Sequence, residues 1–362
     1  MNVNPMEDLF DANLRNVSHI RHKVKAVSQS RGVSFKHLMR AVLTELDGDL
    51  GKVWQRRRRI KRVLDKYGIN DQRSMQWIAK RGEMLTASEI TKAFKTATPA
   101  ARYELFLRKI VGPKPAGGEL QPKALIWGTQ FEFIAKSLYE TFEGIKIVDT
   151  SCVRHPKHSF LGASPDGIVL TPNPMDLRWG KLVEFKCPIS RQFKDDSPVP
   201  EYYWHQMQLQ MECTDIDTCD YLEFRFEQLP YTKWTESTAQ YKGAYVCLDD
   251  TGEVVYKPAG MEYMTWIRTE INPKAEDYQT VFWALAQWRK VVVPRDFTWM
   301  STHLEELTEF WQEVLRYRET GTLPPNPNPV NVLSLDLTGE QCTDSPDAPS
   351  VLPQSDPPAE TS

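Results

Sequence analysis

The sequence contains few cysteines, and none of them is arranged as in a typical metal-binding module. Its six cysteines include no Cys-x-x-Cys pair, and no group of His and Cys residues has the spacing of a zinc site. No apolar run reaches the roughly 18 residues that a membrane-spanning helix needs. The first ten residues also lack the apolar core of a secretion signal. We therefore expect an intracellular protein with reduced cysteines and no contact with a membrane.

Basic residues are absent from one end of the chain and concentrated at the other. Residues 322–362 contain nine prolines, six Asp or Glu and no Lys or Arg, whereas residues 1–75 contain 16 Lys or Arg against eight Asp or Glu. The net charge of −3 is therefore the average of two opposite segments and says little about binding partners. The composition predicts a basic helical extension over 1–70 and a disordered, acidic, proline-rich tail over 321–362.

The spacing of apolar residues predicts an alternation of helices and strands between these ends. We expect helices over Phe35–Leu46, Ala124–Phe142, Glu201–Cys213, Glu276–Lys290 and Thr302–Tyr317, and two short helices within Ser74–Phe94. Strands are predicted over Ile145–Val153 and Asp220–Glu227, and a hairpin is predicted from Gly243–Leu248 and Glu253–Tyr256. This order of elements predicts an α/β fold.

One predicted helix carries a dense basic cluster. The segment Gly51–Arg62 reads GKVWQRRRRIKR and includes seven Lys or Arg. Such a cluster is typical of a nucleic-acid contact or a nuclear localisation signal. It is also compatible with the solvated face of a helix that packs through its apolar residues. The candidates for contacts to a nucleic-acid backbone are Arg56, Arg57, Arg58, Arg59, Lys61 and Arg62.

The stretch Phe160–Pro188 combines two short apolar runs with acidic residues. Asp166 directly precedes the first run, Gly167–Leu170, and the second run is Lys181–Lys186. In a strand, residues two apart point to the same face, so Glu184 and Lys186 project together. If the two runs pair as a hairpin, Asp166 lies beside Glu184.

Two carboxylates and a lysine at one place indicate metal-dependent phosphodiester chemistry. Mg²⁺ binds through one or two carboxylates together with waters and substrate phosphate. It polarises the phosphodiester and lowers the pKa of a bound water, and a lysine can orient that water or stabilise developing charge. A solvated strand face with a cross-strand ion pair is the alternative interpretation of an isolated Glu-x-Lys. His155 and His158 are weaker metal-ligand candidates because no third ligand lies at a suitable spacing.

These residues resemble the PD-(D/E)XK nuclease signature, with Pro165-Asp166 followed by Glu184-Phe185-Lys186. Four further motifs resemble the lambda-exonuclease/YqaJ-type viral recombinase branch of that superfamily. In chain order they are WIAKR (77–81) leading to TAS (86–88), WGT (127–129) leading to Glu132, GASPDG (162–167), and YWHQMQ (203–208). Together they cover about residues 74–226.

The resemblance implies a fold and an activity. The fold would be a PD-(D/E)XK core over residues 71–320, with a mixed twisted β-sheet flanked by helices. The activity would be metal-dependent exonuclease digestion of duplex DNA from a 5′ end, in viral or phage recombination, repair or replication. Asp166, Glu184 and the backbone carbonyl of Phe185 would bind Mg²⁺ or Mn²⁺, and Glu132 would support the metal or its waters. Lys186 and Gln206 would position the nucleophilic water.

The resemblance also implies how DNA ends are read. Arg81 and Ser88 match positions that hold a terminal 5′-phosphate, although Ser88 could equally be a plain helix cap. Expected partners are double-stranded DNA, a single-strand annealing protein and further copies of the chain, in the host nucleus or cytoplasm if the protein is viral. The sequence does not fix the polarity of digestion. A structure-specific endonuclease and a non-catalytic DNA-end-binding module on a nuclease fold remain alternatives.

Overall fold

The computed structural model describes residues 17–46, 49–67, 75–112, 122–171, 176–249 and 251–327 of the 362-residue chain. Most of the predicted acidic tail, from residue 328 onward, lies outside the described residues, as do residues 172–175 between the two apolar runs of the predicted hairpin.

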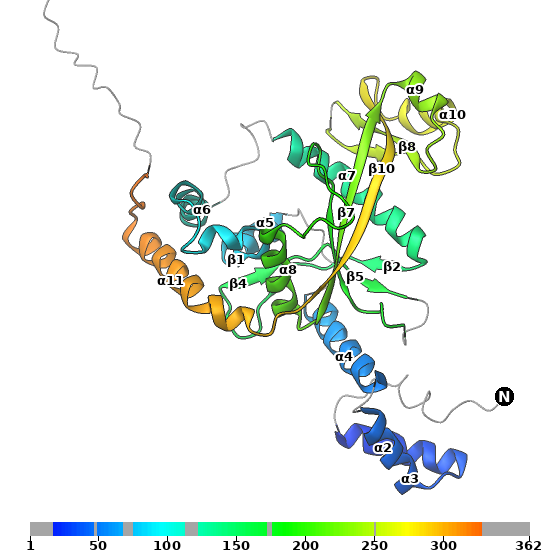
Figure 1. The fold of residues 1–362 in the computed structure, drawn as a ribbon, viewed down its shortest axis with the longest axis vertical. Coiled ribbons are helices and arrows are strands. Elements are labelled where there is room, and N and C mark those ends of the chain that lie inside the picture. Colours follow the sequence, from blue (N-terminus) through cyan, green and yellow to red (C-terminus); the bar gives the residue numbers. More distant parts are fainter. Residues whose placement is uncertain are drawn as a thin grey trace, which may run out of the picture.

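A seven-stranded mixed sheet forms the centre of the molecule (Figure 1). Its strands, in spatial order, are β2 (Lys146–Val148), β5 (Gly167–Leu170), β6 (Leu182–Lys186), β7 (Thr218–Leu229), β10 (Tyr278–Pro294), β8 (Lys242–Leu248) and β9 (Val254–Tyr256). Only β6 and β7 pair in parallel, and the other neighbours are antiparallel. A separate three-stranded sheet consists of β1 (Leu85–Thr86), β4 (Leu161–Ala163) and β3 (Val153–Arg154).

Helix α7 (Lys123–Glu143) covers one face of the seven-stranded sheet and α8 (Glu201–Thr214) covers the other, which makes the fold a mixed α/β architecture, as predicted. The other helices of the described residues are α2 (Val17–Arg31), α3 (Phe35–Leu46), α4 (Asp49–Tyr67), α5 (Met75–Gly82), η1 (Ala87–Ala93), α6 (Pro99–Val111), α9 (Tyr231–Glu236), α10 (Tyr263–Trp266), the π-helical turn η2 (Ile267–Ile271) and α11 (Trp299–Thr320). Strand periodicity separates the two faces. Leu182 belongs to the core beneath α8, whereas Val183 and Phe185 belong to the core beneath α7. Glu184 therefore points toward α8.

Several predicted elements are confirmed. The structure contains the helix Phe35–Leu46 with the predicted bounds, and α7, α8 and α11 lie where the sequence predicts helices. The hairpin of β5 with β6 and the hairpin of β8 with β9 are also present. The predicted strand at 220–227 corresponds to β7.

The helix predicted over Glu276–Lys290 is wrong. This segment is most of the long strand β10, which pairs with β7 along one edge and with β8 along the other. Both of its faces carry large apolar residues: Trp283 and Leu285 pack against one core, while Phe282 packs against another. Apolar residues on both faces obscure the alternation by which an ordinary strand is recognised.

Two other predictions are partly wrong. The single strand expected over Ile145–Val153 is divided between β2 and β3, which belong to different sheets. The second short helix expected within Ser74–Phe94 is the 3₁₀ helix η1, preceded by the short strand β1. Both differences arise from pairing with β4. Strand β1 pairs in parallel with one edge of β4, and β3 pairs with its other edge, so these residues form strands of a second sheet.

Helix α4 packs against the core of the fold although it lies within the predicted extension 1–70. Its Ile60 and Val63 are buried, and both belong to the same apolar core as residues of α8 and α11. The close approach extends to Gly180, where an added Cβ would lie 2.3 Å from Ile60 Cδ1. Helix α4 is thus packed against the connection that leads into β6.

Candidate active site

The β5–β6 hairpin brings Asp166 and Glu184 together. Gly167 pairs with Val183 and Ile168 with Leu182, so the residue before β5 lies opposite Glu184. Asp166 Oδ2 accepts a hydrogen bond of 2.7 Å from the Phe185 backbone N–H. Because the strand period is two, Lys186 lies on the same face as Glu184 and forms an ion pair with Glu184 Oε1. The convergence expected from the sequence is present.

Helix α8 adds two glutamines to this cluster. Gln206 Nε2 donates to Glu184 Oε1 at 2.5 Å, and Gln210 Nε2 donates to Glu184 Oε2 at 2.6 Å. The Glu184 side chain is only 1% exposed, so these donors supply the polar contacts that water would otherwise make. Gln206 was a predicted site residue, but Gln210 was not. The sequence feature that could have identified Gln210 is its four-residue spacing from Gln206, which places both glutamines on one helix face.

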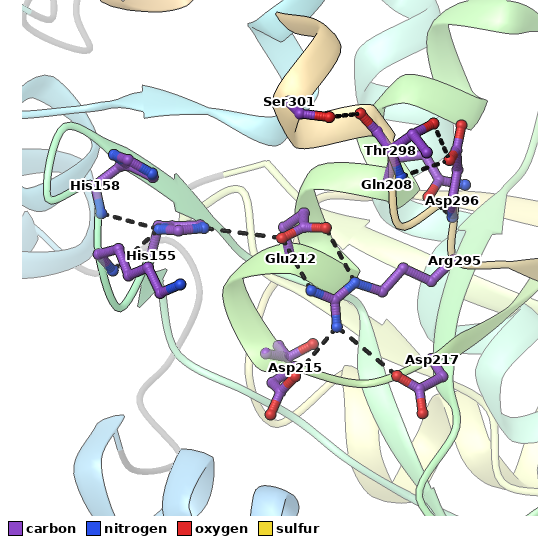
Figure 2. A network of polar contacts seen from close by, with 12 residues as sticks. His155, His158, Gln208, Glu212, Asp215, Asp217, Arg295, Asp296, Thr298 and Ser301 are labelled. Carbon is purple, nitrogen blue, oxygen red and sulfur yellow. Dashed lines mark hydrogen bonds and ion pairs between the residues drawn. The ribbon is translucent and has the colours of Figure 1, made fainter. Parts of the chain in front are cut away.

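The third glutamine of α8 has a structural role. Gln208 donates to the carbonyl of Pro294 at 3.0 Å and accepts from the Asp296 N–H at 2.7 Å. Figure 2 shows Gln208 directed toward Asp296 and the segment before α11. Gln208 thus anchors the end of β10 and does not join the carboxylate cluster.

A surplus of negative charge characterises the cluster. Burial raises the pKa of Asp166 well above its usual value, and the neighbouring carboxylates of Glu184 and Glu132 raise it further. Glu132, on α7, is thus close enough to influence Asp166. However, within the described ranges, no three His, Cys, Asp or Glu side chains gather as a ready metal-binding group.

This donor set fits a divalent cation. Two acidic side chains supply hard oxygen ligands, which Mg²⁺ and Mn²⁺ prefer, and Mg²⁺ normally completes its shell with waters and substrate oxygens. A cation would also offset the repulsion that raises the Asp166 pKa. The sequence-predicted ligand role of the Phe185 carbonyl stays a prediction.

Lys186 carries a stable positive charge in this setting. Burial lowers the pKa of its ammonium group, but the attraction of Glu184 and Asp166 outweighs burial, so the pKa is raised overall. The ammonium also lies 4.4 Å from the centre of the Tyr203 ring, at the start of α8. Lys186 is therefore a fixed cation beside two carboxylates.

The predicted phosphate-binding residues also meet. Arg81, at the end of α5, donates from Nη2 to Ser88 Oγ at 2.9 Å. Ser88 is exposed and belongs to η1. The backbone N–H of Thr86, the residue before η1, donates to the Glu89 carboxylate at 2.9 Å. Thr86 is thus the residue that precedes the helix, and Ser88 is not its cap.

The side chain of His155 stabilises the loop that contains both histidine candidates, His155 and His158. His155 Nδ1 accepts from the backbone N–H groups of Lys157 at 3.2 Å and His158 at 2.9 Å. On its other side, His155 Nε2 lies 4.0 Å from Glu212 Oε2. Figure 2 shows His155 between the backbone of this loop and Glu212. These contacts do not assemble a metal site.

The basic residues of α4 fall into two groups: some contact the rest of the fold, and others are exposed. Arg56 donates to the carbonyls of Leu177 and Trp179 at 2.8 and 2.9 Å. Arg59 pairs with two aspartates of the turn after α8, Asp215 at 3.2 Å and Asp217 at 2.8 Å. The remaining candidates differ in position: the Arg57 guanidinium lies 5.9 Å from the Trp179 ring centre, while Arg58, Lys61 and Arg62 are exposed.

A comparison with protein families finds a match to the central part of the chain. Residues 76–217 match the YqaJ-like viral recombinase domain. This match confirms the resemblance drawn from the five motifs. The matched residues include those proposed for the site: Arg81, Ser88, Glu132, Asp166, Glu184, Lys186, Gln206 and Gln210.

Individual relatives are distant. The chain is 24% identical over 305 residues to the uncharacterized protein R354 of Acanthamoeba polyphaga mimivirus, and the match spans 71% of this chain and 55% of R354. The chain thus spans about half the length of this curated relative.

Solved structures similar to the chain include two bacterial exonucleases. One is the alkaline exonuclease LHK-Exo from Laribacter hongkongensis, with 20% identity, coverage of 68% of this chain and 95% of that one, and a TM-score of 0.42. Another is a phage-related exonuclease from Haemophilus somnus, with 14% identity, coverage of 66% and 96%, and a TM-score of 0.38. Separately, none of the helices in the described part of the chain combines the length and apolar character that crossing a membrane requires.

Proposed function

We propose that the chain is a metal-dependent deoxyribonuclease that digests duplex DNA from a 5′ end. The observation that carries this proposal is the convergence of Asp166, Glu184 and Lys186 on one hairpin, with two buried glutamines on the Glu184 carboxylate. The YqaJ-like viral recombinase match supports a role in DNA recombination, repair or replication. In that role, a single-strand annealing protein and further copies of the chain are the expected partners.

The site's own residues define the chemistry. Asp166 and Glu184 would hold Mg²⁺ or Mn²⁺, with the Phe185 carbonyl and Glu132 as further support. Bound there, the metal would polarise the phosphodiester and lower the pKa of a water. Gln206 and Gln210 fix the orientation of the Glu184 carboxylate. Lys186 provides a positive charge that is in place before the phosphate becomes more negative, which avoids reorganisation during the reaction.

End recognition would be separate from hydrolysis. A terminal phosphate carries more negative charge than an internal diester and presents three strong acceptor oxygens. The Arg81 guanidinium can donate two parallel hydrogen bonds to such a group, and the Ser88 hydroxyl can donate another. These two residues would therefore select a chain end without taking part in bond cleavage.

One assay separates this function from its alternatives. Linear and covalently closed circular duplexes are incubated with the full chain in Mg²⁺, in Mn²⁺ and in EDTA. We expect metal-dependent loss of the linear DNA and intact circles. Nicking of circles as fast as linear DNA is degraded would identify an endonuclease. Binding of ends without cleavage under any metal condition would identify a non-catalytic end-binding module.

A further inference from the structure

The end of α5 is held by two cationic side chains from other helices. The last carbonyls of a helix lack partners within it. Here Lys109, from α6, donates from Nζ to the carbonyl of Arg81 at 2.9 Å. Arg318, from α11, donates to the next carbonyl, that of Gly82, at 2.9 Å. The backbone position from which the Arg81 side chain extends is therefore fixed from two directions.

Lys109 is also half of a buried ion pair. Its ammonium pairs with Glu89, and the two side chains are only 5% and 10% exposed. Glu89 is the neighbour of Ser88 in η1, and its carboxylate accepts the Thr86 N–H at 2.9 Å. A single ion pair on α6 and η1 thus connects the end of α5 to the first residues of η1. These are the two elements that carry Arg81 and Ser88.

We propose that Lys109 and Glu89 are positioning residues for recognition of a 5′-phosphate on DNA. This inference rests on the end recognition proposed above for Arg81 and Ser88. Lys109 is too deeply buried to contact DNA, and its ammonium already donates to Arg81 and pairs with Glu89. It acts through the main chain of Arg81, while Glu89 acts through the start of η1. The pair holds the guanidinium and the hydroxyl at the spacing that a single phosphate requires.

The buried pair has a matched control on the same two elements. Lys92 of η1 and Glu104 of α6 form a second ion pair at 2.9 Å, with side chains that are 35% and 58% exposed. This pair also connects η1 to α6. Unlike Lys109, however, Lys92 donates to the side chain of its partner and not to a carbonyl of α5. Lys92→Met therefore removes a lysine from an ion pair between the same elements without releasing the end of α5.

The test compares two substrates with the same preparation of full-length enzyme. Single-turnover rates are measured in Mg²⁺ on linear duplexes with a 5′-phosphate or a 5′-hydroxyl, and binding of both duplexes is measured in EDTA. The variants are Lys109→Met, the double variant Glu89→Gln with Lys109→Met, and Lys92→Met. The double variant keeps an acceptor for the Thr86 N–H and avoids the unpaired buried charge that makes the single variant prone to unfolding.

We expect the ratio of the two rates in the double variant to fall toward one, by about tenfold or more. Displacement of a positioning group by about 1 Å can cost up to about 10²-fold. The rate on 5′-hydroxyl DNA should stay near that of the wild type, and Lys92→Met should keep the full ratio. A general structural defect would lower both rates together and leave the ratio unchanged.

Two results would contradict the inference and can be told apart. If the wild type prefers 5′-phosphate and the folded double variant keeps that preference in both rate and binding, Lys109 and Glu89 do not position the site. If the wild type cleaves in a metal-dependent way without any preference, the proposed end recognition is itself wrong, and this inference falls with it.

Discussion

Among the residues that the structure describes, two lysine–glutamate pairs with buried carboxylates differ in their electrostatic surroundings. Glu184 and Lys186 lie beside a second carboxylate, Asp166, and burial of the Lys186 ammonium is outweighed by this attraction, so its pKa is raised. Glu89 and Lys109 lie beside further cations. There, burial lowers the pKa of Lys109, Glu89 only partly offsets it, and Arg81 and Arg108 lower it again.

The difference between the two pairs agrees with the ligand that we propose for each site. The Glu184 pair has surplus negative charge and would gain from a cation, whereas the Glu89 pair has surplus positive charge and would gain from an anion. A divalent metal and a terminal phosphate are such ligands. The same type of ion pair can thus serve a metal site and a phosphate site, because the neighbouring charges set the sign of the field.

The largest effect is expected at the metal side of this comparison. Asp166→Asn keeps an oxygen that can accept the Phe185 N–H but removes the anionic charge. The rate of hydrolysis should fall by at least about 10²-fold, the order seen when a catalytic electrostatic group is lost. Single-turnover cleavage of linear duplex in Mg²⁺ measures it. DNA binding in EDTA should be retained, and near wild-type cleavage by this variant would refute the assignment.

Gln210 offers a sharper test of the same cluster, since it contacts Glu184 but is not among the site residues predicted from the sequence. Gln210→Leu removes the donor to Glu184 Oε2 and leaves that oxygen without this partner. Residues that orient a metal ligand typically contribute about 10- to 100-fold in metal affinity or activity. We expect a higher Mg²⁺ concentration for half-maximal rate. A variant that loses rate at all Mg²⁺ concentrations, with an unchanged half-maximal concentration, would indicate a packing role.

On the phosphate side, the expected change is in preference. Arg81→Ala removes the guanidinium that donates to Ser88 and leaves the hairpin that carries Asp166 and Glu184 unaltered. Faster degradation of 5′-phosphorylated than of 5′-hydroxyl duplex should largely disappear, while dependence on metal stays. Competition between the two duplexes in one reaction measures the ratio directly. An unchanged ratio would remove Arg81 from end recognition.

The sequence predicted the hairpin of the candidate active site well because its geometry is local. Two short runs with a period of two determine which side chains share a face, so the approach of Asp166 to Glu184 and Lys186 follows from one pairing. Gln210 was harder to predict, because its partner is 26 residues away and depends on how α8 packs on the sheet.

Tertiary packing explains the remaining differences. The strand β10 was mistaken for a helix because it is paired on both edges and covered by apolar groups on both faces. The contacts of Lys109 with Glu89 and with the carbonyl of Arg81 connect three elements between residues 75 and 111. No local pattern in the sequence specifies such a connection.

The smallest expected effect concerns the basic cluster of α4, where the sequence alone suggested one uniform DNA-binding surface. The structure divides it into Arg56 and Arg59, which hold the β5–β6 tip region and the turn after α8, and the exposed Arg58 and Arg62. Two double variants with equal loss of charge can separate these roles: Arg56→Ala with Arg59→Ala, and Arg58→Ala with Arg62→Ala. Each is measured for thermal unfolding and for DNA affinity in EDTA over a range of salt concentrations.

We expect the exposed pair to bind DNA backbone and the inward pair to stabilise the fold. Loss of Arg58 and Arg62 should flatten the slope of log affinity against log salt by roughly 0.9 for each phosphate that is no longer neutralised, and should lower Tm less than loss of Arg56 and Arg59 does. Loss of Arg56 and Arg59 should lower Tm and leave the slope unchanged, since their guanidinium groups are already bound to carbonyls and aspartates. The reverse outcome would mean that α4 leaves its position on the core when DNA binds, exposing the arginines that now face it.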